Sequence, residues 1–470
     1  MNDEHSFEHV LADRMTAERG SAQLPDAFYD EFRQRARRVR QHPRWLALIK
    51  EPPMRTSSTL AVGSPTARVA AIMIATLLVT LAVVGAGIAG SRLLAADGVI
   101  IVDPSDPGAY QTITEAVADA ADGDTVMVKP GTYAESVAIE SDITLQGDGE
   151  RGSVVIAFAS PADGPSYLEG GPDGEPFGYG VLLDGSQAHV ANLTLQGPPD
   201  DGTDPAVSGV YIVGGAPVIE DIDVVLFGDR WNYGGGWYYR RSALRITGGS
   251  TATVRDSTWD GYVRIFGEPN APTFEGNTIT GQDISIADEG HEPVIRGNTL
   301  LDSAALLWND GGSGGIAEDN DISGWIAIDD GEGAANDPII RGNRIQGGAA
   351  GDAAGQFAGA GIGIAGNATP LVEDNEIADS SIGVFVIGDG AAPEIRGNAI
   401  RGSSNSAIIV ALGATTSIDD NTIEDNVTGV AVRAPSTATL NGNSFCGNEQ
   451  DLVVPDGSAL TLDGNTVCDA

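Results

Sequence analysis

Short apolar runs alternate with polar residues along most of the chain after residue 98. In phrases such as FEGNTI, IRGNTL and AEDNDI, apolar residues flank an asparagine at fixed offsets, which predicts a short strand with one buried face. The phrases recur every 21 to 23 residues, with one interval of 32, and their asparagines are Asn277, Asn298, Asn320, Asn343, Asn375, Asn398, Asn421, Asn443 and Asn465. The chain therefore contains a structural repeat of about 22 residues.

A second strand is predicted in each repeat by phrases such as GVYIVGG, ALRITGG, YVRIFGE and GVFVIGD. No stretch between the strands is long enough for the helix of a leucine-rich or ankyrin repeat. Two or three short strands per repeat, joined by Asn, Asp and Gly turns, predict an all-β solenoid whose coils stack about 4.8 Å apart. We expect the recurring asparagine to tolerate the left-handed bend of each coil and to bond to the same amide one coil away, as an asparagine ladder.

A cap helix is predicted at the start of this region, where YQTITEAVADAADGD places Ile113, Ala116, Val117 and Ala120 on one helical face. The phrases that follow, GDTV, KPGTY and ITLQGDG, complete a run that resembles the opening of pectin lyase-like right-handed parallel β-helix proteins. The run is similar both to bacterial surface proteins of the copper-accessory NosD type and to pectin methylesterases. The resemblance covers residues 98–470 and implies a right-handed parallel β-helix. It implies no single activity, because the superfamily includes lyases, hydrolases, esterases and proteins with no known reaction.

Residues 69–90 form an uncharged apolar run of 22 residues, which is long enough to span a bilayer. A buried core helix, or a signal peptide cut near Ala96, is the alternative. Residues 1–68 carry a net charge of +2 and the residues after Arg92 carry −43. By the positive-inside rule, we expect a single-pass cell-membrane protein with a basic cytoplasmic tail (1–68), a transmembrane helix (69–90) and an extracytoplasmic β-helix (98–470).

The net charge of −40 excludes nucleic acid as a partner on electrostatic grounds. The chain has two Cys and five His, too few for a zinc, haem or iron–sulfur site, and we expect no cofactor. Copper is unsupported, because the β-helix region has only His189 and His291. Calcium remains an alternative at Asp200, Asp201 and Asp204, or at Asp329, Asp330 and Glu332, although neither group has the spacing of a dedicated calcium loop.

Two catalytic patterns of the superfamily are incomplete here. The pair Gln282-Asp283 matches the start of the pectin methylesterase pattern, but the phrase one coil later, Ala304 to Trp308, lacks the acid. Of the sequence phrases typical of polygalacturonases, only an Asp-Asp pair is present, as Asp419-Asp420 inside a turn of the repeat. Lyase or hydrolase activity is left open.

One row of outward positions suggests a binding surface. If Val210 and Ile212 point inward, Tyr211 points outward. The same register then exposes Arg245, Arg264, Ser285, Leu307, Ala327, Gly363, Phe385, Ile409, Ala431 and Val453. Two arginines one strand spacing apart repel each other unless acids or an anionic ligand offset them, which suggests a carboxylated sugar.

Further ligand-binding candidates lie beside this row. Tyr262, Asp283, Trp325 and Asp329 occupy neighbouring outward positions, with Asp283 and Asp329 about two coils, near 10 Å, apart as candidate catalytic acids. The insertion DRWNYGGGWYYRRS could overhang the row and offer Trp231, Trp237 and Tyr238 as platforms for sugar rings. The alternative is that this loop folds back and covers the coil.

Cys446 and Cys468 lie 22 residues apart in matching phrases, so we expect a disulfide between the last two coils.

Together these patterns predict a membrane-anchored extracytoplasmic β-helix protein that binds polysaccharide, with cleavage as a further hypothesis. The alternative is a non-catalytic surface protein for adhesion or structural interaction, which meets a protein partner through an exposed apolar row at Phe385, Ile387 and Ile409.

Overall fold

The computed structural model describes residues 98–158, 178–198, 207–227, 231–233, 236–238, 241–302, 304–309, 311–329, 333–347, 357 and 359–468. The predicted tail (1–68) and membrane span (69–90) lie outside these residues. Within the described ranges, no helix is long and apolar enough to cross a membrane.

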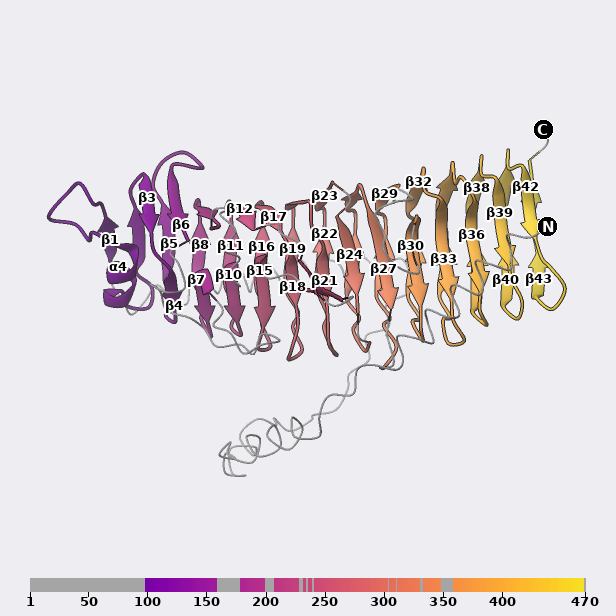
Figure 1. Ribbon diagram of the computed structural model, residues 1–470, viewed down its shortest axis with the longest axis horizontal. Coiled ribbons are helices and arrows are strands. Elements are labelled where there is room, and N and C mark those ends of the chain that lie inside the picture. Colours follow the sequence, from indigo (N-terminus) through magenta and orange to yellow (C-terminus); the bar gives the residue numbers. More distant parts are fainter. Residues whose placement is uncertain are drawn as a thin grey trace, which may run out of the picture. The chain divides into compact units, whose positions relative to one another are not determined.

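The described chain is a stack of coils, and each coil contributes one strand to each of three parallel sheets, which we name A, B and C (Figure 1). Sheet A contains β1 (Val99–Val102), β2 (Thr125–Val128), β5 (Thr144–Gly147), β8 (His189–Ala191), β11 (Val218–Glu220), β16 (Thr253–Arg255), β19 (Thr273–Glu275), β22 (Val294–Arg296), β25 (Ile316–Glu318), β28 (Ile339–Arg341), β31 (Leu371–Glu373), β34 (Glu394–Arg396), β37 (Thr415–Asp419), β40 (Thr437–Asn441) and β43 (Ala459–Asp463).

Sheet B follows sheet A within each coil. It contains β3 (Gly131–Ala134), β6 (Val154–Ala157), β9 (Thr194–Gln196), β12 (Asp223–Phe227), β17 (Thr258–Gly261), β20 (Thr278–Thr280), β23 (Thr299–Leu301), β26 (Asp321–Ile322), β29 (Arg344–Gln346), β32 (Glu376–Ala378), β35 (Ala399–Arg401), β38 (Thr422–Glu424), β41 (Ser444–Cys446) and β44 (Thr466–Val467).

Sheet C closes the coil. It contains β4 (Val137–Ile139), β7 (Gly178–Asp184), β10 (Val207–Val213), β15 (Arg241–Thr247), β18 (Val263–Ile265), β21 (Ile284–Ile286), β24 (Ala305–Trp308), β27 (Trp325–Asp329), β30 (Ala360–Ala365), β33 (Ile382–Ile387), β36 (Ser406–Ala411), β39 (Thr428–Val432) and β42 (Gln450–Val453). A separate hairpin pairs β13 (Trp231–Tyr233) with β14 (Gly236–Tyr238).

The interior of the coil is a continuous apolar core, because every strand alternates inward and outward side chains. In sheet C, Val210, Leu244, Val263 and Ile284 occupy equivalent inward positions in successive coils, and each is at most 1 % exposed. Each coil covers the apolar residues of its neighbour, so stability accumulates along the stack.

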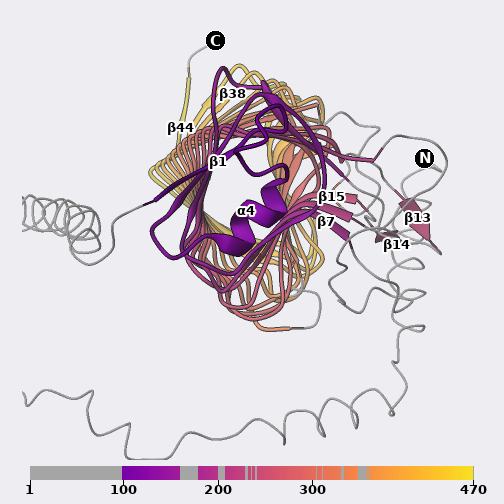
Figure 2. The same cartoon turned by 90° about the vertical axis from the view of Figure 1, so that its left-hand side faces the viewer.

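The predicted cap helix is present as α4 (Ile113–Asp119), which covers the first coil in the view along the stack (Figure 2). Its buried residues are Ile113, Ala116 and Val117. Thr112 caps the helix by accepting a hydrogen bond from the Glu115 N–H at 3.2 Å.

The asparagine ladder is also present. From Asn277 to Asn465, each asparagine Nδ2 donates to Oδ1 of the equivalent asparagine one coil later, over 2.8 to 3.1 Å. The expectation that asparagine itself takes the left-handed conformation is wrong. That conformation falls on the preceding residue, which is Gly276 (φ 67°) in one coil and Asp319 (φ 55°) in another. The asparagine side chain is thereby aimed along the stack, where its amide bonds run from coil to coil.

Candidate functional site

The outward row of sheet C has the register expected from the sequence. Tyr211 pairs with Arg245, Arg245 with Arg264, and Arg264 with Ser285. The pairing continues without a slip along the remaining positions of the row, which are Leu307, Ala327, Gly363, Phe385, Ile409, Ala431 and Val453. The two arginines are therefore direct neighbours on adjacent parallel strands.

The expectation that this whole row is exposed is wrong. Tyr211 is 1 % exposed, Arg245 8 % and Ser285 2 %, whereas Arg264 is half-buried. Tyr211 packs with Leu182 and Phe266 in an apolar cluster outside the coil interior. Side chains as large as tyrosine and phenylalanine cover one another on the outer face, so an outward direction does not produce an open surface.

Arg245, Arg264 and Phe266 form a compact group that we call the cationic cluster. The Phe266 ring centre lies 4.7 Å from the Arg264 guanidinium carbon and 5.9 Å from that of Arg245. Arg245 Nε also donates to Ser242 Oγ at 3.0 Å. An aromatic face attracts cations, so Phe266 stabilises two guanidinium groups that repel each other.

Tyr262 and Asp283 border the cationic cluster. Burial raises the pKa of Tyr262, so its hydroxyl stays protonated near neutral pH, where it forms a hydrogen bond with Ser285. Asp283 is 5 % exposed, and its Oδ1 accepts a hydrogen bond from the Ala305 N–H at 2.9 Å. The two guanidinium groups can donate charge-assisted hydrogen bonds to an anion, and the neutral phenol of Tyr262 adds no negative charge, whereas Asp283 is already bonded to the Ala305 N–H.

The expected spacing of Asp283 and Asp329 is wrong. Because Ile284 pairs with Leu306 and Leu306 with Ile326, Asp283 aligns with Trp325, four residues before Asp329. Two strand spacings and four residues of extended chain put the two Cα atoms about 16 Å apart. Glycosidase carboxyl pairs need separations of about 5 to 9.5 Å. The two acids lie near opposite ends of their strands, and this geometry does not make them one catalytic pair.

Trp325 occupies an outward, half-buried position and packs at the edge of a second apolar cluster on sheet C. In the strand register, Tyr262, Asp283, Ala305 and Trp325 occupy equivalent positions in successive coils. The Cα atoms of Tyr262 and Trp325 are therefore three strand spacings, about 14 Å, apart. Trp325 therefore belongs to the same face as the cationic cluster but does not touch it.

The aromatic insertion forms the β13–β14 hairpin, which lies outside the three sheets on the side of β7 and β15 (Figure 2). Trp231 lies opposite Tyr238, and Asn232 opposite Trp237. The structure describes the backbone of these residues and not their side chains. Their role as platforms for sugar rings stays a prediction.

The expected exposed apolar row for a protein partner is also wrong. Ile387 is 1 % exposed and Ile409 is 2 %, whereas Phe385 is half-buried. These side chains belong to an apolar cluster that includes Phe357, whose ring packs where a Cβ on Gly363 would lie. Glycine at this position of the row leaves room for the phenylalanine, which fills the outer face instead of leaving it open.

Metal ligands do not converge among the described residues, where no three His, Cys, Asp or Glu side chains form a group that could hold an ion. Asp200, Asp201, Asp204, Asp330 and Glu332 lie outside these residues. A calcium site there stays untested.

Cys446 and Cys468 are joined in a disulfide between adjacent coils, with their Cα atoms 5.0 Å apart. This is the pairing expected from the repeat.

The outer face of sheet A carries a ladder of alternating charges that was not predicted from the sequence. The outward positions of successive coils alternate in sign, with Arg296 on Glu275 at 3.0 Å, Arg341 on Glu318 and Arg396 on Glu373 at 2.7 Å. The signal was visible as IRGN phrases that alternate with EDN phrases. The ladder runs through Glu220, Arg255, Glu275, Arg296, Glu318, Arg341, Glu373, Arg396 and Asp419.

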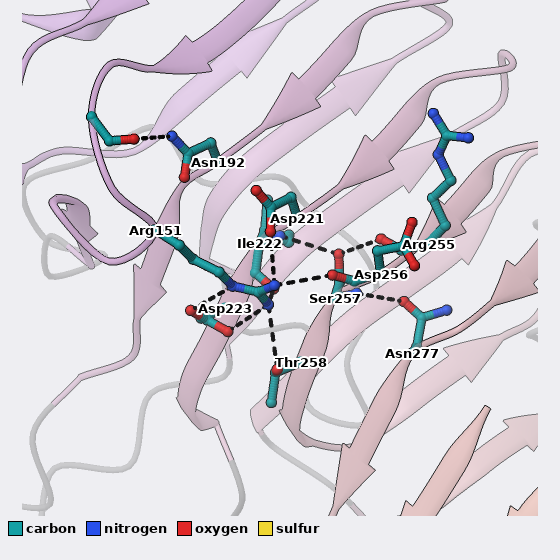
Figure 3. A network of polar contacts seen from close by, with 11 residues as sticks. Arg151, Asn192, Asp221, Ile222, Asp223, Arg255, Asp256, Ser257, Thr258 and Asn277 are labelled. Carbon is teal, nitrogen blue, oxygen red and sulfur yellow. Dashed lines mark hydrogen bonds and ion pairs between the residues drawn. The ribbon is translucent and has the colours of Figure 1, made fainter.

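A second missed feature is Arg151, which extends from the turn between β5 and β6 (Figure 3). Its guanidinium donates to Asp223 from Nε at 3.0 Å and from Nη2 at 2.7 Å, and to Asp221 from Nη1 at 2.7 Å. It also reaches the carbonyl of Asp256 at 3.2 Å. One side chain thus ties a turn near the capped end to later coils, at the corner between sheets A and B and away from the cationic cluster.

Comparison with known proteins agrees with this architecture. Residues 325–470 match a family model described as a right handed beta helix region. Residues 325–470 thus share the fold of right-handed parallel β-helix proteins, and the same stack of parallel coils continues through the other described residues. A comparison with curated protein sequences returned no match.

Several solved structures resemble this β-helix protein. The A-module of mannuronan C-5 epimerase AlgE6 from Azotobacter vinelandii is 16% identical with a TM-score of 0.41, covering 76% of this chain and 93% of its own. The catalytic domain of a GH87 alpha-1,3-glucanase is 12% identical with a TM-score of 0.46, covering 80% and 70%. Pectin methylesterase PemA from Erwinia chrysanthemi is 14% identical with a TM-score of 0.33, covering 54% and 82%.

Proposed function

We propose that this β-helix protein binds an acidic polysaccharide on the outer face of sheet C, with the cationic cluster as the site for a sugar carboxylate. The observation that carries the proposal is the direct pairing of Arg245 with Arg264 over one shared aromatic ring. A carboxylate that lies between two neighbouring guanidinium groups can accept charge-assisted hydrogen bonds from both, which are stronger than hydrogen bonds between neutral groups.

The distribution of charge across the described coils supports this choice of face. On sheet A, each arginine of the ladder has a glutamate on the neighbouring strand. At the cationic cluster the strand neighbour of Arg264 is Arg245 on one side and Ser285 on the other. The chain is strongly acidic as a whole, so an anionic ligand needs such a local concentration of positive charge.

A carbohydrate is proposed as the carrier of the carboxylate because of the nearby insertion, which contains three tyrosines and two tryptophans within residues 229–242. Aromatic rings stack on the apolar faces of sugars, and their hydroxyl or indole groups hydrogen-bond to the polar edges. The proposal is limited to binding, because Asp283 and Asp329 are too far apart to act as a catalytic pair.

We further propose that the β-helix is extracytoplasmic and anchored through residues 69–90. The support is the length of the uncharged run and the excess of positive charge before it.

The binding proposal is tested by titrating the purified full chain with oligogalacturonate, oligomannuronate and neutral cello-oligosaccharide, with product analysis for cleavage. Arg264→Ala should weaken binding of the acidic sugars by about 1 to 3 kcal/mol, which is the cost of losing one charge-assisted contact. Binding of neutral sugar should change little.

The matched control is Arg296→Ala, which removes the same charge from sheet A, where Arg296 pairs with Glu275 at 3.0 Å. This variant should bind acidic sugar like the parent. Equal losses in the two variants would mean that net charge, and not the cationic cluster, controls binding. No binding of any acidic sugar would refute the proposal itself.

A further inference from the structure

The corner between sheets C and A contains a second ladder, and one of its members is a histidine. Asn270, His291, Ser313 and Asn336 occupy equivalent places in four successive coils, and each is at most 1 % exposed. Each of the last three side chains accepts a hydrogen bond from the backbone N–H of the preceding member, as when Asn270 N donates to His291 Nδ1 at 3.0 Å. His291 is the only titratable side chain of these four.

The surroundings of His291 fix its protonation state. Nδ1 faces the N–H of Asn270, which can only donate, so Nδ1 must accept. Nε2 lies 2.7 Å from the carbonyl oxygen of Ala287, which can only accept, so Nε2 must carry the proton. The folded corner therefore accommodates neutral imidazole, and a second proton on Nδ1 would point at the N–H of Asn270.

This corner also holds the aromatic ring of the cationic cluster. Asn270 Nδ2 donates to the carbonyl of Phe266 at 3.0 Å, and Ala287 packs in the same apolar cluster as Phe266. The two atoms that bond to His291 thus belong to residues that position Phe266. A shift of Asn270 or Ala287 would therefore act on Phe266, whose ring lies near the guanidinium groups of Arg245 and Arg264.

We propose that uptake of a proton by His291 opens this corner, displaces Phe266 and weakens the binding of an anionic ligand at the cationic cluster. The ligand part of this inference rests on the proposed function, and the opening of the corner does not. Mild acid would then release the polysaccharide from the protein.

The burial of His291 determines whether the closed corner becomes more or less stable as the pH falls. Desolvation lowers its pKa from the ordinary value of 6.5, although the Ala287 carbonyl and Asp288 act in the opposite sense. The opened corner therefore binds the proton more tightly than the closed one. The closed form is fully favoured above pH 6.5 and loses its advantage as the pH falls below that value.

The other charged groups at this corner are carboxylates. Glu268, Asp288, Glu289 and Glu292 are carboxylates on the two turns, and Asp337 is a carboxylate two coils on. Ordinary carboxyl groups titrate around pH 4, as do those of sugar acids, and arginine stays charged throughout. The ordinary pKa of the imidazole, 6.5, lies within the range tested, about pH 5.5 to 7.5.

The test compares the full chain with His291→Asn, which places the residue found one coil earlier at this position and keeps an acceptor that does not titrate. Hydrogen exchange of residues 262–291 is measured at about pH 7.5 and 5.5, corrected for intrinsic exchange rates, and oligogalacturonate is titrated at both values. If His291→Asn does not fold, His291→Ser, which copies Ser313 of the next coil, takes its place.

We expect exchange in the parent to rise at the lower pH, and its affinity for oligogalacturonate to fall by up to about tenfold per pH unit, the limit for one linked proton. The variant should show neither change beyond about twofold. The same pH response of exchange in parent and variant would overturn the proposed opening of the corner. Absence of binding at the higher pH would refute the proposed function alone, because the exchange measurement still decides whether His291 opens the corner.

Discussion

Removal of Asn343 from the asparagine ladder should destabilise the middle of the solenoid far more than removal of the last rung. Asn343 is 1 % exposed. Its Oδ1 accepts from the N–H and the Nδ2 of Asn320, at 3.0 and 2.8 Å, and its Nδ2 donates to the carbonyl of Ala317 at 2.9 Å. The substitution Asn343→Ala leaves the buried N–H of Asn320 and the buried carbonyl of Ala317 without these partners, whereas Asn320 Nδ2 still donates to the Ile295 carbonyl at 2.9 Å.

Each buried polar group left without a partner costs about 1 to 3 kcal/mol, so the loss of two partners in Asn343→Ala should lower the free energy of unfolding by about 2 to 6 kcal/mol. Asn465 is the matched control, because it makes the same bonds to Asn443, at 3.0 and 2.9 Å, but is half-buried in the last coil. Water can replace its bonds, and Asn465→Ala should cost about 1 kcal/mol.

Urea unfolding followed by circular dichroism measures the difference between the two variants. Because a repeat array can unfold in parts, hydrogen exchange of the coils around residue 320 should be followed as well. Equal destabilisation by both substitutions, or a loss below about 1 kcal/mol for Asn343→Ala, would show that the ladder contributes little to stability and that the apolar core holds the coils together.

Two further predictions concern the ends of the chain. Protease added to intact cells should digest the region after Arg92 and spare a tag at the N-terminus, because the basic residues precede the uncharged run; protection of the C-terminal region would contradict this orientation. The disulfide between Cys446 and Cys468 closes a loop of 22 residues, so Cys468→Ser should destabilise the last coil by about 2 to 4 kcal/mol. Hydrogen exchange of the middle coils should stay unchanged in this variant. Two free thiols in mass spectra of the natively isolated protein would refute the pairing.

The sequence predicted the coil, the cap helix, the asparagine ladder and the strand register because these depend on local periodicity. The inward and outward alternation of a strand is set by its neighbours in sequence, so Arg245 and Arg264 could be aligned without a structure. The repeat also located the two cysteines one coil apart.

Burial of the outer face could not be predicted in this way. The cover on sheet C comes partly from contacts between outward side chains of different coils, such as Tyr211 and Phe266, and partly from Phe357, which lies outside the strands; strand alternation gives the direction of a side chain and not its burial. The offset between Asp283 and Asp329 does not follow from the repeat, because the number of coils gives their separation along the stack and not the four residues of displacement along the strand. The His291 ladder was missed because its members are of three residue types, so no recurring letter marks it.

The arrangement of charge gives a physical reason to place function on sheet C. A solenoid puts equivalent residues about 4.8 Å apart, so any charged position that repeats in every coil repels its neighbours along the whole stack. On sheet A this repulsion is avoided by alternation, with Glu318 between Arg296 and Arg341. Arg245 and Arg264 break that rule on neighbouring strands. An anionic ligand bound beside both guanidinium groups lowers the repulsion between them, and a ligand that binds only the folded coils also stabilises those coils.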